Sequence, residues 1–239
     1  AGWPHRPASR RGCVMTVPFY VSPEQIIKDK ADYARKGIAR GRSVVVLQYD
    51  GGILFVAENP SRALHKVSEI YDRIAFAGVG KYNEFDQLRV AGVRAADLKG
   101  YQFSRQDVDA RSLTNQYAQI LSQMFSEGPK PMEVELLIAE IGQDSSSDRM
   151  FHVLYDGTVL DEHDFAILGG DSDAVSARLK SEFKQGSSLK DAIRLAVSAL
   201  SGPDRKLGKT ELEIALLERN GKRRCFRRVE DDEIQKLLK

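Results

Sequence analysis

The sequence predicts an α+β fold in which two mostly antiparallel sheets stack face to face between two helix pairs. This is a four-layer αββα sandwich with an additional N-terminal helix. Runs of strand-forming residues are separated by pairs of helix-forming segments, which argues against alternating strand–helix units and a parallel sheet. Asp-Gly and Asn-Gly turns join apolar runs into hairpins. The runs 44–47 and 136–139 lack polar alternation, as expected of strands covered on both faces.

The N-terminal helix is expected over residues 23–40. Ser22 and Pro23 are start signals, Ser22 as the cap and Pro23 in the first turn. Apolar residues then recur at helical spacing and predict one buried stripe, made of Ile27, Ala31, Ala34 and Ile38. A hairpin follows directly, with strands 43–49 and 53–58 around the turn Asp50-Gly51-Gly52.

The remaining elements repeat this order of strands and helix pairs along the chain. We expect a strand at 74–79, helices at 82–98 and 107–125, and strands at 133–141, 150–155, 158–160 and 165–168. Helices follow at 174–182 and 189–200, then a hairpin of strands 211–218 and 224–229, then a C-terminal helix at 231–239.

We predict a single domain over residues 15–239, whose sandwich spans 43–229. Residues 1–14 carry Pro, Ser, Arg and Gly without periodicity and are expected to be a disordered leader or a non-native extension, with Met15 a plausible true start.

Composition narrows the function classes. The 239 residues carry a formal net charge of +2, so no whole-molecule field attracts nucleic acid or anionic lipid. Two cysteines and four scattered histidines provide neither a disulfide framework nor metal-ligand spacing, and we expect no cofactor. No apolar run approaches the roughly eighteen residues of a membrane span. We expect a cytoplasmic protein that binds neither membrane nor nucleic acid, although a nucleic-acid-binding role of the basic first helix is a weak alternative.

Five segments in a fixed order indicate a family: 19–24, 32–38, the hairpin with Asp50-Gly51 and Ala57-Glu58, 134–139 and 167–170. Together they resemble the α-type subunits of the 20S proteasome, the actinobacterial branch in particular. The resemblance covers about 19–218 and implies the N-terminal-nucleophile hydrolase fold. None of the five segments is diagnostic alone, but the ordered set is specific.

The resemblance also implies that this chain is not an enzyme by itself. In the catalytic β-type sibling, a threonine with a free α-amine begins the first strand. Here that position is Arg42, beside Ser43 and behind more than forty residues. The sibling's acid corresponds to Glu58, and its lysine falls near Asp72, which has the wrong charge. We therefore expect no catalytic residue. The alternative is an active peptidase or amidohydrolase of this fold after internal processing, for which the only Gly-Thr pair is Gly157-Thr158.

What the resemblance implies instead is a structural and gating subunit of a threonine-type endopeptidase complex. Seven copies would form a homo-heptameric ring through heterologous contacts. Segment 15–22 would form the axial gate, supported by Pro23, Asp32 and Tyr33, although the tail could also be merely frayed. The sequence lacks the Tyr-Asp pair that orders the open gate in many relatives. The expected gate residues are Thr16, Val17, Pro18, Phe19, Tyr20 and Val21.

The expected partners are β-type subunits, a hexameric ATPase activator, and unfolded protein substrates that pass the gate. Lys66, within Leu64–Val67, resembles the lysine that lines the pocket between adjacent α subunits. There the ammonium pairs with the C-terminal carboxylate of the docking activator. The alternative is an exposed, solvated lysine.

Overall fold

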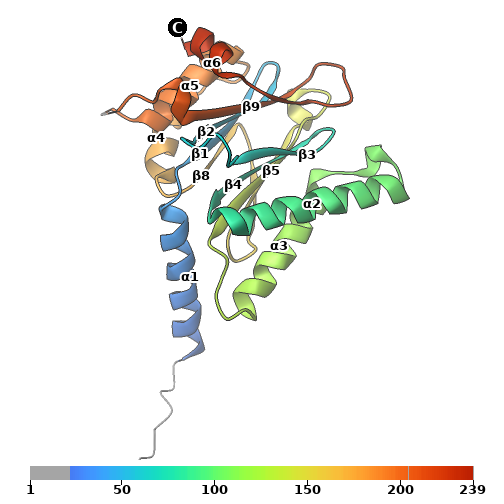
Figure 1. The fold of residues 1–239 in the computed structure, drawn as a ribbon, viewed down its shortest axis with the longest axis vertical. Coiled ribbons are helices and arrows are strands. Elements are labelled where there is room, and N and C mark those ends of the chain that lie inside the picture. Colours follow the sequence, from blue (N-terminus) through green and yellow to red (C-terminus); the bar gives the residue numbers. More distant parts are fainter. Residues whose placement is uncertain (1–21, 204, 239) are drawn as a thin grey trace, which may run out of the picture.

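A computed structural model of the chain describes residues 22–203 and 205–238. The predictions for the leader and for the gate residues 16–21 lie outside the described residues. Two five-stranded antiparallel sheets stack between helices, which confirms the predicted four-layer sandwich (Figure 1).

The first sheet has the strand order β10-β9-β2-β1-β8. Its centre is the predicted hairpin, in which Tyr49 pairs with Gly52 and Val44 with Ala57. The positive φ of 149° at Gly52 explains why glycine ends this turn. Its strands are β1 (Val44–Tyr49), β2 (Gly52–Glu58), β8 (Phe165–Leu168), β9 (Leu212–Glu218) and β10 (Phe226–Arg228).

The second sheet follows the sequence order β3-β4-β5-β6-β7. Its first strand was not predicted, because Ser68 and Glu69 interrupt the apolar pattern of an edge strand that is only partly covered. The strands are β3 (Val67–Tyr71), β4 (Ile74–Gly80), β5 (Val134–Glu140), β6 (Arg149–Val153) and β7 (Val159–Glu162).

Helix pairs cover both outer faces, as predicted. α2 (Tyr82–Gln102) and α3 (Ala110–Ser126) pack on the second sheet, whereas α4 (Ser172–Glu182) and α5 (Leu189–Ser201) pack on the first, with α6 (Asp231–Leu238) beside α5 (Figure 1). Short 3-10 turns occupy Arg105–Asp107, Ser145–Ser147 and Lys209–Glu211. The extra helix α1 (Pro23–Ala39) projects from one end of the sandwich. No helix within the described ranges is long and apolar enough to cross a bilayer.

Side chains of β1 alternate between two cores. Val44 and Val46 face the core between the sheets, and Val45 and Leu47 face the layer of α4, α5 and α6. Because both faces of this strand are apolar and buried, its sequence shows no polar alternation. The prediction of strands covered on both sides is thus confirmed for β1.

Candidate functional site

The C-terminal half of helix α1 packs at the end of the sandwich where β1 and β5 begin and β4 ends. Ser22 caps it, since its Oγ accepts a hydrogen bond from the nitrogen of Gln25 at 3.2 Å. Ala34 and Ile38 are buried in the core between the sheets, together with residues of β4 and β5. The C-terminal half of α1 therefore closes this end of the core.

A lysine ties the middle of α1 to the C-terminal end of α3. The Lys30 Nζ donates to the carbonyl oxygens of Phe125 at 2.9 Å, Ser126 at 3.2 Å and Gly128 at 3.0 Å. The last carbonyls of a helix lack partners within the helix and carry its negative dipole end, which a cation stabilises. This contact fixes α1 relative to the second helix layer.

The N-terminal half of α1 departs from the predicted buried stripe. Ile27, the first residue of that stripe, is 56% exposed because the helix extends beyond the sandwich, and its neighbour Ile26 is 44% exposed. The three residues expected to support the ring or gate are spread along the helix. Pro23 starts the helix, Asp32 pairs with Arg35 at 3.7 Å, and the half-exposed ring of Tyr33 lies 5.5 Å from the Lys130 ammonium.

The start of β1 follows α1 through the short link 40–43 of the uncleaved chain. Ser43 is buried, and its carbonyl oxygen accepts from the nitrogen of Glu58 at 3.2 Å. The nitrogen of Ser43 is a peptide nitrogen that continues from α1. Its lone pair is delocalised into the carbonyl group, so it cannot act as the general base of an N-terminal nucleophile.

Two arginines hold the carboxylate of Glu58 next to this strand start. Arg205 donates to both carboxylate oxygens, at 2.9 Å from Nη1 to Oε1 and 2.6 Å from Nη2 to Oε2, and Arg42 donates to Oε1 as well. Burial alone would raise the pKa of Glu58, but these hydrogen bonds and charges overcome it and hold the pKa below its usual value. A carboxylate held in this way is a weak base.

The Glu58 cluster, made of Arg42, Glu58 and Arg205, therefore lies where the catalytic sibling has its nucleophile and contains no effective base. Neither guanidinium can accept a proton near neutral pH. Sequence reasoning found Arg42 and Glu58 but missed Arg205, which lies 147 residues after Glu58 and carries no local signal of its role. Asp72, near which the sibling's lysine was expected to fall, is not part of this cluster. It lies in the β3–β4 turn and binds Arg105 at 2.7 and 2.9 Å.

Lys66 is the lysine that approaches the start of β1. Its Nζ donates to the carbonyl oxygen of Arg42. Burial lowers the pKa of Lys66 to about 8, against the opposing effect of the Glu58 and Glu213 carboxylates. The side chain is thus partly buried and engaged, which differs from a freely solvated surface lysine.

Glu213, which sequence reasoning did not single out, anchors the segment that carries Lys66. Its Oε2 accepts from the nitrogen of Lys66 at 2.9 Å and from Nδ2 of Asn59 at 2.8 Å, and its Oε1 accepts from the nitrogen of Val67 at 3.2 Å. Arg228 of β10 also donates to Oε1. These contacts fix the position of Lys66 relative to the first sheet.

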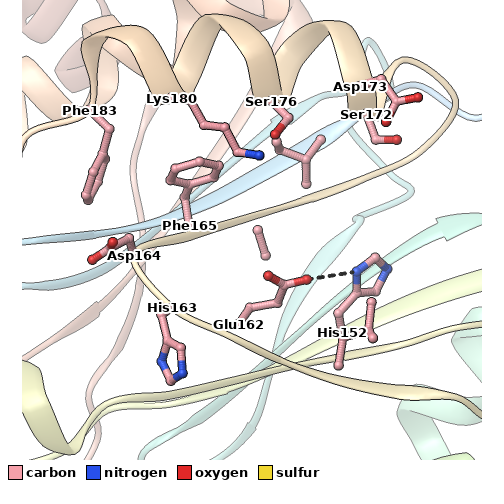
Figure 2. A pocket seen from close by; sticks show the side chains of 13 residues that line it. His152, Glu162, His163, Asp164, Phe165, Ser172, Asp173, Ser176, Lys180 and Phe183 are labelled. Carbon is pink, nitrogen blue, oxygen red and sulfur yellow. Dashed lines mark ion pairs between the residues drawn. The ribbon is translucent and has the colours of Figure 1, made fainter.

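A cleft of about 690 Å³ lies between α4 and the β7–β8 connection (Figure 2). A buried histidine, His152, lines this cleft. Its Nδ1 lies 3.7 Å from Glu162 and its Nε2 lies 3.7 Å from Glu135. Burial would lower the pKa of His152, but the two carboxylates raise it to about 9.

The cleft chemistry favours a structural role for His152. An imidazole that is protonated at neutral pH cannot serve as a general base for Ser172 or Ser176 on the facing helix. Instead, His152 joins β5 to β7, and Glu135 also accepts from the nitrogen of Gly169 at 3.2 Å beyond the end of β8. Among the described residues, no group of three or more His, Cys, Asp or Glu side chains could hold a metal ion.

Comparison with known proteins agrees with this arrangement. Residues 38–216 match the family model for the proteasome subunit. The chain is 57% identical to "Proteasome subunit alpha" of Acidimicrobium ferrooxidans, over 94% of this chain and 97% of the relative. It is 59% identical to the protein of that name from Thermomonospora curvata, over 94% of this chain and 98% of the relative. It is 54% identical to that of Thermobifida fusca, over 94% of this chain and 91% of the relative. The chain therefore belongs to the proteasome subunit family, and within it to the α-type subunits, which are not catalytic.

Proposed function

We propose that this subunit forms a homo-heptameric ring that caps a ring of β-type catalytic subunits in the cytoplasm and controls access to it. The observation that carries this proposal is the Arg42–Glu58–Arg205 cluster, placed behind α1 where a catalytic sibling would have its free nucleophile. Segment 15–22, which immediately precedes α1, would form the axial gate for unfolded substrates.

The surface of α1 supports a ring contact. The side chains of Ile26, Ile27 and Tyr33 are each more than two-fifths exposed on a helix that projects from the sandwich. Exposed large apolar groups that gather on one element favour a protein contact. In a closed ring each subunit presents one face to a different face of its neighbour. The exposed side of α1 would be one of these two faces, and Pro23, Asp32 and Tyr33 would belong to it.

Lys66 would dock the C-terminal carboxylate of a hexameric ATPase activator. In the free chain its ammonium donates to a neutral main-chain carbonyl, that of Arg42. A carboxylate would be a stronger partner, because charge-assisted hydrogen bonds are shorter and roughly twice as strong as neutral ones. With the pKa of Lys66 lowered to about 8, the charge that attracts the activator declines as the pH rises above that value.

The test of the proposed function is co-expression with the β-type sibling, followed by electron microscopy and a peptidase assay. We expect a particle with capping rings of this chain, and intact mass showing that the chain is not cleaved at an internal Ser or Thr. A monomer that never enters a larger particle would contradict the proposal. A new N-terminus at an internal Ser or Thr would favour the active hydrolase instead.

The docking role of Lys66 is tested separately in that particle. Lys66→Ala should abolish activator-stimulated degradation of a folded substrate and leave hydrolysis of a short peptide unchanged. The matched control is Lys190→Ala, an exposed lysine of α5 without an ion pair among residues 22–203 and 205–238. Equal stimulation of wild type and Lys66→Ala would remove the assignment.

A further inference from the structure

A second cavity of about 440 Å³ adjoins the Glu58 cluster. It lies between the N-terminal end of α4, the C-terminal end of α5 and the α1–β1 junction. Two carboxylates, Glu58 and Asp171, line it. Four guanidinium groups line it as well, a formal excess of two positive charges, from Arg40, Arg42, Arg178 and Arg205.

Only part of this positive charge is neutralised inside the protein. Glu58 binds Arg42 and Arg205, as described above. Arg178 uses its Nε to donate to the carbonyl oxygen of Ala199 at 2.8 Å. In the described part of the chain, neither Nη1 nor Nη2 of Arg178 has an acceptor, and the side chain of Arg40 has none either.

The first turn of α4 adds main-chain donors at the same cavity. Its cap residue, Asp171, makes no side-chain capping bond, and Ala174 lines the cavity. The first amides of a helix have no partner within the helix and form its positive dipole end. Helix N-termini bind phosphate-like anions for this reason. At this cavity the arginines supply most of the positive charge, and the helix end adds to it.

We propose that this cavity binds a phosphate group, either as inorganic phosphate or as part of a larger phosphate ester. Guanidinium groups match the oxygens of a phosphate in bidentate pairs, and several donors from different elements suit a tetrahedral oxyanion with two negative charges. The volume exceeds that of a lone phosphate and lies in the range of small-molecule sites. The bound anion ties Arg40 and Arg42, at the end of α1, to Arg178 on α4.

The proposal goes beyond the ring and gating function. The site uses the position where the catalytic relatives have their nucleophile, but it requires neither a β-type partner nor an activator. Phosphate binding therefore stabilises the junction between α1 and the sandwich in the full chain alone, and it is measured without any peptidase activity.

The experiment measures thermal unfolding and ³¹P line broadening of the full chain against inorganic phosphate, with sodium chloride of equal ionic strength as reference. Wild type should gain stability with phosphate, and Arg178→Gln should bind phosphate at least about tenfold more weakly, because a charged donor pair is lost. The control is Arg94→Gln, an exposed arginine of α2 outside the cavity, which should respond as wild type does.

The measured quantity is the phosphate-dependent shift, so a lower starting stability of Arg178→Gln does not obscure the result. Arg178→Lys, which keeps the charge but not the bidentate geometry, should show an intermediate affinity. A parallel titration with ADP identifies the source, since tighter binding than inorganic phosphate assigns a phosphate ester and equal binding assigns the free ion. A phosphate response equal to that of chloride, or an affinity in Arg178→Gln equal to that of wild type, would overturn the proposal.

Discussion

Replacing Glu58 by glutamine should destabilise the fold without affecting peptidase chemistry in the assembled particle. Glutamine keeps the size of the side chain and one carbonyl acceptor but removes the negative charge. Arg42 and Arg205 would then face each other across a neutral amide that accepts fewer of their hydrogen bonds. If Glu58 were a catalytic acid instead, activity would fall while stability stayed constant.

The magnitude follows from burial on the two sides of the cluster. Removing one partner of a fully buried ion pair costs about 3–5 kcal/mol. That is an upper bound here, because the carboxylate of Glu58 is 5% exposed but the side chains of Arg42 and Arg205 are 48% and 49% exposed and regain water. We expect a loss of about 2 kcal/mol, the scale of a charged hydrogen bond. For a chain of this size that lowers Tm by roughly 4–8 °C.

Urea unfolding of wild type and Glu58→Gln at a series of pH values measures this difference. The folded-state pKa of Glu58 is lowered, so its contribution is present above the ordinary value of 4.5 and is lost as pH falls through the lower folded value. The gap between the two proteins should therefore close in acid. The control is Glu69→Gln. The carboxylate of Glu69 lies 2.6 Å from Arg224, whose side chain is largely exposed, so this variant should lose clearly less unfolding free energy than Glu58→Gln. Equal losses for both variants, or a gap that is constant with pH, would refute the reasoning.

Two further changes probe the interior. His152→Gln should lose about 1–3 kcal/mol at pH 6, because Glu135 and Glu162 then lack the imidazolium between them. The pKa of His152 is raised to about 9, so this difference in unfolding free energy is fully present below pH 6.5 and should vanish as the pH rises through 9. Urea titrations at several pH values measure the difference, and a difference unchanged at pH 10 would contradict the prediction. Gly92→Ala would normally stabilise a helix by about 1 kcal/mol, but its Cβ would lie 1.6 Å from the Tyr117 hydroxyl. Thermal unfolding should show a net loss of about 1–3 kcal/mol that Tyr117→Phe partly restores, and additive effects in this double-mutant cycle would exclude the clash.

The sequence was sufficient for the layers of this fold because the layers depend on local patterns. Turns such as Asp50-Gly51 and runs such as Val44–Leu47 report short-range conformation and two-sided burial. β3 was missed because a partly exposed edge strand has a mixed pattern that resembles a loop. The polar partners of the candidate site were predicted less completely. Glu58 and Arg205 meet only because β2 and the segment after α5 end at the same side of the first sheet.

The first helix shows a different limit of sequence reasoning. Its apolar periodicity predicted one buried stripe. The sandwich buries Ala34 and Ile38 and partly covers Ala31, while Ile27 faces solvent in the single chain. Helical periodicity indicates that an apolar surface will cover a face of the helix, and it does not specify which molecule provides that surface. The part of the stripe near β4 and β5 is covered by this chain, and the part beyond the sandwich is what a neighbouring subunit would cover. The same helix therefore excludes a free nucleophile at its C-terminal end and offers a contact surface at its N-terminal end, which is the combination that a ring-forming, non-catalytic subunit requires.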